Sequence, residues 1–251
     1  MKKINYIFFI SFLLLLVISC KTAVLNEDYQ LYPNKEINDS IKPDSLYIKI
    51  ISPYKQQLDS IMSQPISYAN VDFTKEGFSS NEGNLLADLV LDFSKKYTKE
   101  NKLPMPDFCL LNIGGIRTII PKGVITVGNI YEVAPFENEL VFIQLDGTQM
   151  SEMFEYLRKE KLGHPLAGIN VVYKKDKFFS AEIEGVPYNK NKKYWVVTLD
   201  YLLTGGDRMY FFTKSDQVTL PHIKLREVLL EQIKKYKILP ESKDQRLIFQ
   251  E

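Results

Sequence analysis

The chain has 251 residues, of which 45% are hydrophobic and 25% charged, a composition typical of one large globular domain or two small ones. Its 32 Lys and Arg residues nearly balance its 31 Asp and Glu residues, so no strong electrostatic field is available to attract nucleic acid. The composition therefore argues against a nucleic-acid-binding protein.

The N-terminus has the pattern of a secretory signal peptide over residues 1–19. Two lysines precede an apolar run over residues 7–18, which is shorter than the about 20 residues that a membrane span needs. Residues 17–20, Val-Ile-Ser-Cys, also resemble the lipobox of bacterial lipoproteins, in which the cysteine is lipidated. We therefore expect an exported bacterial lipoprotein, anchored to a membrane through Cys20 and facing the periplasm or the cell surface. A plain signal peptide or membrane anchor is the alternative.

The rest of the chain divides into a short tether and one folded domain. Residues 20–43 comprise the lipidated cysteine and a polar segment, and the domain is expected over residues 44–251. The other cysteine, Cys109, lies in an apolar run, which favours a small buried thiol in a strand over a nucleophile. If Cys20 carries lipid, Cys109 has no disulfide partner.

Hydrophobic spacing predicts four helices and seven strands. Asp44 is expected to cap the first helix, and Pro53 to kink or interrupt it. Helices are expected over residues 45–61, 85–97, 147–158 and 223–236, and strands over residues 66–69, 108–111, 140–145, 169–173, 178–183, 194–199 and 246–249. Because these elements do not alternate strictly, we predict an α/β fold of the α+β type, with a mixed, partly antiparallel sheet and helices on its outer faces.

One loop carries residues suited to an anionic ligand. The strand at residues 108–111 ends at Asn112, and Gly114 and Gly115 allow the backbone to approach a ligand closely. Arg117 then offers a forked donor for a phosphate or a carboxylate. The structural alternative is a tight turn with a surface arginine.

Two further loops carry aromatic and polar side chains. Phe136 lies between Pro135 and a polar pair ending at Asn138, and it is either a ligand-facing ring or a core aromatic. Tyr201 and Asp207 flank a Gly-Gly turn, where they could stack a base and accept hydrogen bonds from ribose hydroxyls. The alternative for Asp207 is that it only caps the turn.

Taken together, these segments resemble the C-terminal domain of the 5′-nucleotidase family, which includes ecto-5′-nucleotidase and the periplasmic UDP-sugar hydrolases. The resemblance runs from about residue 44 to the C-terminus. Six motifs carry it in order: Gly83-Asn-Leu-Leu-Ala-Asp88, Asn112-x-Gly-Gly-Ile-Arg117, Gly123-Val-Ile-Thr126, Pro135-Phe-x-Asn138, Leu145-x-Gly147 and Tyr201-Leu-x-x-Gly-Gly-Asp207.

The resemblance implies a domain that binds substrate between two aromatic rings. Phe136 and Tyr201 would sandwich the base, and Asp207 would accept from the ribose hydroxyls. Asn112 and Asn138 would bind polar groups of the substrate, and Arg117 would meet the phosphate. The implied substrate-binding residues are Asn112, Gly114, Gly115, Arg117, Phe136, Asn138, Tyr201 and Asp207.

The chain departs from the family pattern at three places. Tyr201 replaces the usual Phe, and Ile113 replaces a Gly. The family also has a further phosphate-facing Arg upstream of Gly83, whereas residues 74–81 contain none. Either Arg208 or Lys75 could take over its role.

The metal-binding half of the family has no counterpart in the sequence motifs. In the full family an N-terminal metallophosphatase domain holds two metal ions that activate water. This chain has only His164 and His222, neither in a metal-ligand context, and both are expected at the surface. We therefore expect no catalytic residue, metal or cofactor in this chain, and divalent metals only in a partner metallophosphatase.

These expectations lead to one main hypothesis and two alternatives. The main hypothesis is that the chain is the nucleotide-binding or nucleoside-binding half of a split 5′-nucleotidase, with nucleotide phosphate hydrolysis performed by a separately encoded metallophosphatase. The first alternative is a periplasmic nucleoside-binding or nucleotide-binding lipoprotein with no catalytic role. The second is a scaffold that kept the fold and lost the ligand.

Overall fold

A computed structural model describes residues 34–38 and 40–251, so the predicted signal peptide and Cys20 lie outside the described residues. The chain divides after Ile48, and the unit from Lys49 to Glu251 contains every strand of the described residues. The described residues before Ser45 form neither helix nor strand.

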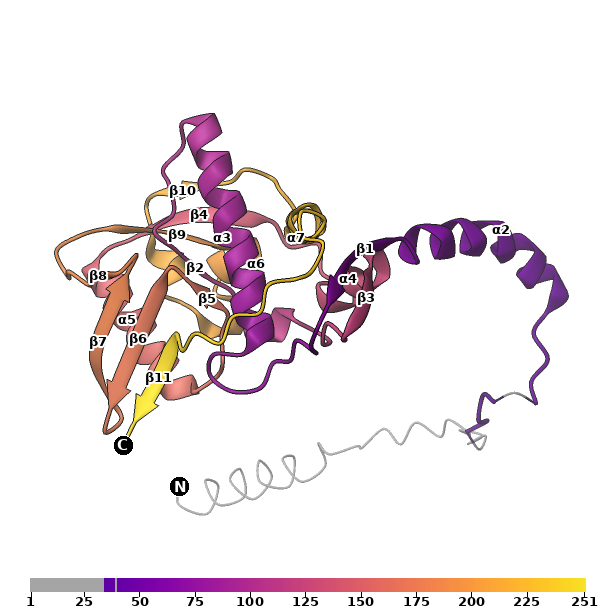
Figure 1. Cartoon of the computed structure of the whole chain (residues 1–251), viewed down its shortest axis with the longest axis horizontal. Coiled ribbons are helices and arrows are strands. Elements are labelled where there is room, and N and C mark those ends of the chain that lie inside the picture. The colour runs from indigo at the N-terminus through magenta and orange to yellow at the C-terminus, as the bar shows by residue number, and fades with distance from the viewer. Residues whose placement is uncertain (1–33, 39) are drawn as a thin grey trace, which may run out of the picture. The chain divides into compact units, whose positions relative to one another are not determined.

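Helix α2 (Ser45–Met62) is the first regular element of the described chain. Its cap is the predicted one, because the Asp44 carboxylate accepts a hydrogen bond from the Leu46 N–H at 2.8 Å. The helix continues through Pro53, so the interruption expected there is wrong, although the ribbon curves along its length (Figure 1). None of its residues is buried.

The larger sheet forms the centre of the domain (Figure 1). Its strands, in spatial order, are β10 (Val218–Thr219), β4 (Leu140–Leu145), β9 (Tyr194–Leu199), β2 (Phe108–Leu110) and β5 (Leu166–Ala167). Strands β2 and β9 are parallel and the other neighbours antiparallel, which confirms the predicted mixed sheet. Cys109 in β2 is fully buried, as predicted, and burial raises the pKa of its thiol.

Two smaller sheets flank this centre. The four-stranded sheet contains, in order, β11 (Leu247–Gln250), β6 (Ile169–Lys174), β7 (Lys177–Ile183) and β8 (Val186–Pro187). Burial alternates along β6, so one face of this sheet meets the core and the other meets solvent. The two-stranded sheet pairs β1 (Pro65–Ala69) with β3 (Gly123–Thr126) in antiparallel orientation.

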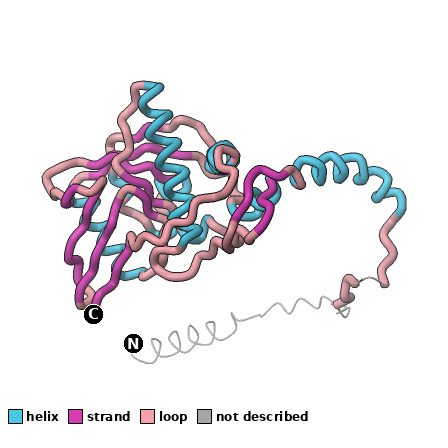
Figure 2. The backbone as a smooth tube through the Cα atoms, viewed as in Figure 1, coloured by secondary structure: helices cyan, strands magenta, loops and turns pink. Residues whose placement is uncertain are grey.

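Helices cover the sheets, as Figures 1 and 2 show. Helix α3 (Asn81–Asn101) contacts β2, β5 and β9 and also packs against α7 (Leu225–Ile233). Helix α5 (Gly147–Glu160) contacts β4 of the five-stranded sheet and β7 of the four-stranded sheet, and so joins these two sheets. Helix α3 starts four residues before the expected position, because the Ser80 hydroxyl accepts from the Gly83 N–H and caps it.

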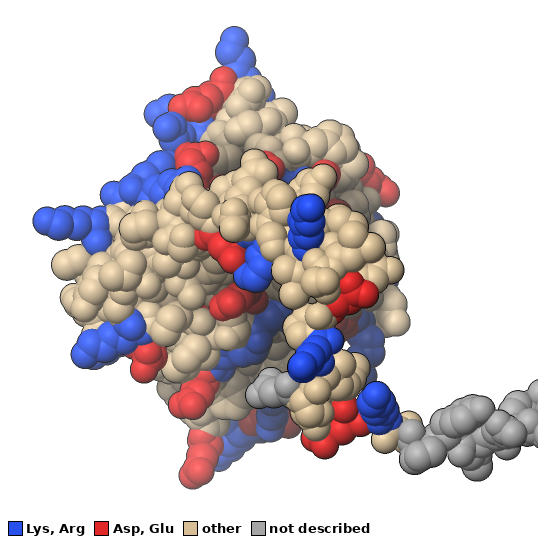
Figure 3. All heavy atoms as spheres, turned by 90° about the vertical axis from the view of Figure 1, so that its right-hand side faces the viewer, with Lys and Arg blue, Asp and Glu red and all other residues tan. Residues whose placement is uncertain are grey.

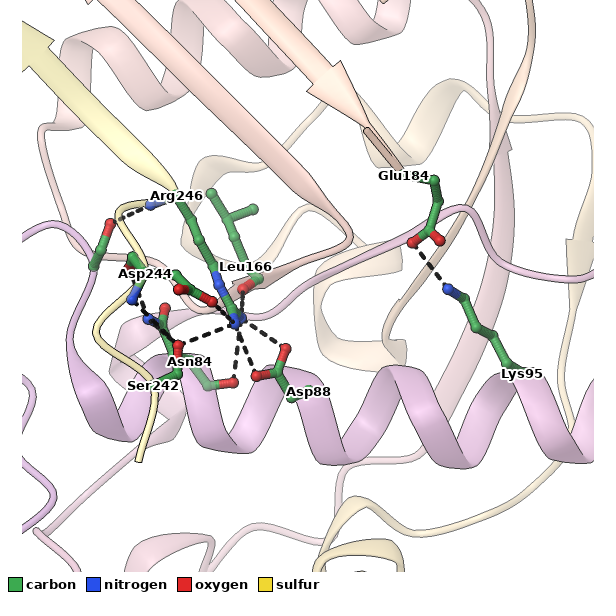
Figure 4. Close-up of polar contacts among 9 residues, drawn as sticks. Asn84, Asp88, Lys95, Leu166, Glu184, Ser242, Asp244 and Arg246 are labelled. Atoms are coloured by element: carbon green, nitrogen blue, oxygen red, sulfur yellow. Dashed lines mark hydrogen bonds and ion pairs between the residues drawn. The ribbon is translucent and has the colours of Figure 1, made fainter. Parts of the chain in front are cut away.

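A buried arginine ties the C-terminal segment to helix α3 (Figure 4). Both terminal nitrogens of Arg246 donate to the Asp88 carboxylate at 2.8 Å, and one of them also donates to the Leu166 carbonyl at 2.7 Å. The Asn84 amide donates to the Asp244 carbonyl beside it. The Gly83–Asp88 motif therefore fastens the chain just before β11, which is a structural role.

Charged side chains are interspersed on the face drawn in Figure 3, where Lys and Arg lie among Asp and Glu. Ion pairs between charged side chains of the described residues include Lys214 with Glu152 and Arg158 with Glu155. Within residues 34–38 and 40–251, no helix is both long and apolar enough to cross a bilayer.

Candidate functional site

The three predicted loops meet at one edge of the five-stranded sheet. Strands β2 and β9 are parallel, so the chain leaves both at the same edge, and β4 is antiparallel to β9, so the chain enters it there. In β4 and β9, Leu140 lies opposite Leu199. The segments after β2, before β4 and after β9 are therefore neighbours, although they are far apart in sequence.

These loops enclose a pocket of about 370 Å³. Its lining residues are Asn112, Gly114, Gly115, Arg117, Phe136, Asn138, Tyr201 and Asp207. All eight predicted site residues therefore lie together. Phe136 is 48% exposed and Tyr201 is 44% exposed, so neither ring is a core aromatic, and both are accessible to a ligand.

The Asp207 carboxylate is held by two side chains that also line the pocket. The Asn112 amide donates to one of its oxygens at 2.7 Å, and the Tyr201 hydroxyl donates to the other at 2.9 Å. A carboxylate has about four acceptor positions, so two remain for donors from a ligand. The hydroxyl that distinguishes Tyr201 from the usual Phe therefore orients this carboxylate.

Backbone at Gly206 packs directly against Tyr201. A Cβ atom at this position would lie 2.5 Å from the Tyr201 carbonyl oxygen and 2.5 Å from its ring. Only glycine allows this approach, so Gly206 lets the turn pack directly against the Tyr201 ring.

The Phe136 loop is fastened to the start of helix α7 by Arg226. This buried side chain donates to the Ala134 carbonyl at 3.0 Å and forms an ion pair with Glu137, so it holds the loop on both sides of Phe136. Its guanidinium also lies 4.3 Å from the centre of the Tyr131 ring. Hydrogen bonds from Lys224 and Arg226 lower the pKa of Glu137, which keeps its carboxylate charged.

Asp200 joins the two loops that carry the aromatic rings. Its carboxylate accepts from the Glu139 N–H at 3.1 Å and from the Tyr201 N–H at 2.8 Å. Its own N–H donates to the Glu139 carbonyl at 3.0 Å. These contacts fix the Phe136 loop relative to Tyr201, and the sequence patterns identified neither Asp200 nor Arg226.

Arg117 is the one cation among the described residues that line the pocket. It donates to the Gly114 carbonyl at 3.3 Å, and its guanidinium lies 5.9 Å from the centre of the Phe136 ring. Neither of the two candidate substitutes for the missing arginine lines the pocket. Lys75 donates to the Ile116 carbonyl at 3.0 Å, and Arg208 pairs with Glu160 at 2.8 Å.

The region of the missing arginine instead contains a buried acid, Glu82, in the first turn of α3. Its side chain is fully buried, and neither carboxylate oxygen has a hydrogen-bond partner among the described residues. Burial raises the pKa of Glu82 to about 8, and the charge of Lys75 offsets only part of this rise. At neutral pH the folded protein therefore keeps this carboxyl mostly protonated.

The protonation of Glu82 predicts a specific pH dependence of stability. In the unfolded chain the carboxyl ionises near pH 4.5, so its favourable contribution to folding is complete below that pH and is lost as the pH rises toward 8. A Glu82→Gln variant should be more stable than the wild type by about 4 kcal/mol at pH 7.5, and the difference should vanish near pH 4.5. Urea unfolding at several pH values measures this. Glu76→Gln, at an exposed position in the same segment, is the control, and parallel pH curves for Glu82→Gln and the wild type would contradict the assignment.

The two histidines differ in their surroundings. His222 is at the surface, as expected, with 73% of its side chain exposed and Glu139 3.0 Å away. His164 is only 3% exposed, so the surface position expected for it is wrong. It lies beneath the Asn112–Arg117 loop, where its Nδ1 accepts a hydrogen bond from the Ile113 N–H at 3.2 Å. This hydrogen bond offsets part of the free-energy cost of burying the polar ring. Within the described chain, no three His, Cys, Asp or Glu side chains cluster as metal ligands would.

Comparison with known families identifies the class of this domain. The family model described as 5′-nucleotidase, C-terminal domain, matches residues 65–214, which is more than half of the chain. The chain therefore belongs to the 5′-nucleotidase C-terminal domain family and is a substrate-binding domain of the nucleotidase type. The matched range contains all eight pocket residues.

Individual relatives agree with this family. The chain is 34% identical over 114 residues to endonuclease YhcR of Bacillus subtilis, covering 45% of this chain and 9% of that protein. It is 27% identical over 174 residues to protein UshA of Yersinia enterocolitica, covering 66% of this chain and 30% of that protein. It is 27% identical over 207 residues to the snake venom 5′-nucleotidase of Macrovipera lebetinus, covering 72% of this chain and 50% of that protein. The chain thus spans at most half the length of these relatives.

Solved structures show the same fold. The 5′-nucleotidase precursor of Thermus thermophilus superposes with a TM-score of 0.69 at 25% identity, covering 83% of this chain and 44% of that one. The NAD nucleotidase of Haemophilus influenzae shares the fold with a TM-score of 0.59 at 20% identity, covering 82% of this chain and 41% of that one. The predicted fold class is therefore confirmed.

Proposed function

We propose that this chain binds a nucleotide or nucleoside in the pocket described above and supplies the substrate-binding half of a split 5′-nucleotidase. The base would stack on Phe136 and Tyr201, and the ribose hydroxyls would donate to Asp207. The observation that carries this proposal is the convergence of all eight residues on one pocket, with the Asp207 carboxylate already oriented by Asn112 and Tyr201.

In this proposal the hydrolytic chemistry comes from a separate metallophosphatase whose divalent metal ions activate water. The roles of the two histidines support it. His164 is buried and bonded to the Ile113 backbone, and His222 is an exposed partner of Glu139. Arg117 would meet the phosphate, and the partner would cleave it, so that the pair acts in nucleotide breakdown.

The same site also fits a pure binding protein, an exported receptor for nucleosides or nucleotides without a catalytic role. The charges that line the pocket favour this candidate for uncharged ligands, because one Arg and one Asp balance each other. A nucleoside needs no counter-charge there, whereas a phosphate carries about −1.5 to −2 charges near pH 7, more than the single positive charge of Arg117 neutralises. In both cases the proposed location is the periplasm or cell surface, with a lipid anchor on Cys20, and membrane fractionation tests it.

Phosphate release from nucleoside monophosphates separates these functions. The purified chain should release little phosphate with divalent metal, and addition of its cognate metallophosphatase should raise the rate well above that of either protein alone. Strong metal-dependent release by the chain alone would contradict the split-enzyme proposal. Tight nucleoside binding with no stimulation of any metallophosphatase would favour the binding protein.

A further inference from the structure

A short chain of hydrogen bonds runs behind the pocket and joins two of its loops. The Ile113 N–H donates to His164 Nδ1 at 3.2 Å. His164 Nε2 lies 3.4 Å from the Tyr156 hydroxyl, and that hydroxyl donates to the Asp207 carbonyl at 2.9 Å. The loop that contains Asn112 and the loop that contains Asp207 are thus connected through two side chains that do not line the pocket.

The directions of these bonds are mutually consistent. Because His164 Nδ1 accepts, its proton lies on Nε2, which can donate to the Tyr156 oxygen. The Tyr156 hydroxyl is then free to donate its own proton to Asp207. Burial lowers the pKa of His164 to about 4 and raises that of Tyr156 to about 12, so both groups stay neutral over the ordinary working range of pH.

The backbone that receives this bond has an unusual conformation. Asp207 has a φ of 50° and Arg208 a φ of 63°, so two consecutive non-glycine residues occupy the left-handed region. Such residues persist where surrounding contacts hold them in place. The Tyr156 hydroxyl bonds the carbonyl of the first of them, and this conformation directs the Asp207 side chain toward Asn112 and Tyr201.

We propose that Tyr156 and His164 are positioning residues that hold the Asp207 backbone against the Asn112 loop and thereby set the recognition of a vicinal diol, such as that of ribose. This inference rests on the proposed function, because it assigns the Asp207 carboxylate to ligand hydroxyls. Arg226 supports the Phe136 loop and Asp200 supports the Tyr201 backbone, so both stacking surfaces have a second support besides this connection, although the Tyr201 hydroxyl also bonds Asp207.

The consequence is selective for one part of the ligand. Removing the Tyr156 hydroxyl should weaken the binding of adenosine about five- to tenfold, the effect of one lost hydrogen bond. It should leave 2′,3′-dideoxyadenosine within about twofold of its wild-type affinity, since that ligand has no hydroxyl for Asp207. A residue with only a structural role would change both affinities by the same factor.

Calorimetric titration of the full chain with the two ligands tests this. Tyr156→Phe is the main variant, and His164→Asn is the second, since its amide oxygen keeps an acceptor for the Ile113 N–H while the contact with Tyr156 is lost. Tyr188→Phe is the matched control, a half-buried tyrosine whose hydroxyl donates to the Gly147 carbonyl, and it should bind both ligands as the wild type does.

Each outcome has a distinct meaning. Loss for adenosine alone in both variants supports the proposal. Equal loss for both ligands, or no loss for either, would overturn it while the proposed function stands. If the wild type binds neither ligand, the proposed function fails first and this inference fails with it.

Discussion

Replacing Arg246 with methionine is expected to lower the free energy of unfolding by about 2–3 kcal/mol, because Arg246 is buried whereas the Asp88 side chain is 41% exposed and water can solvate it when the pair is broken. The guanidinium is buried, and its loss would leave the Asp88 carboxylate and the Leu166 carbonyl without their donor. This contact lies just before β11, which belongs to the four-stranded sheet. Its loss should therefore loosen the attachment of the C-terminal segment to α3. Urea unfolding followed by circular dichroism measures the change.

The control for this effect is Arg208→Met. Arg208 pairs with Glu160, but 70% of its side chain is exposed, so the same replacement should cost less than about 1 kcal/mol. An equal effect of the two substitutions would show that the Arg246–Asp88 pair does not hold the C-terminal segment.

The second large effect concerns the aromatic rings of the pocket. Phe136→Ala and Tyr201→Ala should each weaken adenosine binding about 5- to 100-fold, because a stacked base contributes about 1–3 kcal/mol per aromatic side chain. Tyr201→Phe keeps the ring and removes only the bond to Asp207, so its loss should be smaller, about two- to tenfold. Calorimetric titration of each variant gives these ratios.

Phe179→Ala is the matched control for the ring substitutions. Phe179 is 57% exposed on β7 and is not among the residues that line the pocket. It should bind adenosine as the wild type does. Unchanged binding in Phe136→Ala and Tyr201→Ala would mean that the rings are not a clamp, and would favour a scaffold that kept the fold without the ligand.

The long elements of the fold could be predicted from sequence because their patterns are strong. Strands β4 and β9 are six-residue runs that are apolar except for Gln144 and Thr198, and α5 begins at Gly147, directly after its capping residue Asp146. The strands β3, β5, β8 and β10 were missed because two to four residues carry no periodicity. Helix α4 (Val127–Val133) was missed as well, although Thr126 and Asn129 form its capping box.

The pocket could be predicted because its lining residues lie in short loops with glycine and aromatic motifs. The residues that hold the pocket loops in place could not be predicted, since each makes a contact with a residue that is distant in sequence. Arg226 donates to the Ala134 carbonyl, 92 residues away in the sequence, and His164 accepts a hydrogen bond from the Ile113 N–H, 51 residues away. The wrong placement of His164 has the same origin, because its Gly-His-Pro context is typical of an exposed turn.

The position of a bound nucleotide tests the central claim most directly. A crystal structure of the chain grown with saturating adenosine monophosphate should show the base against the rings of Phe136 and Tyr201, with the ribose hydroxyls within hydrogen-bond distance of Asp207. A nucleotide bound elsewhere, or a pocket that stays empty at saturating concentration, would contradict the assignment of this site.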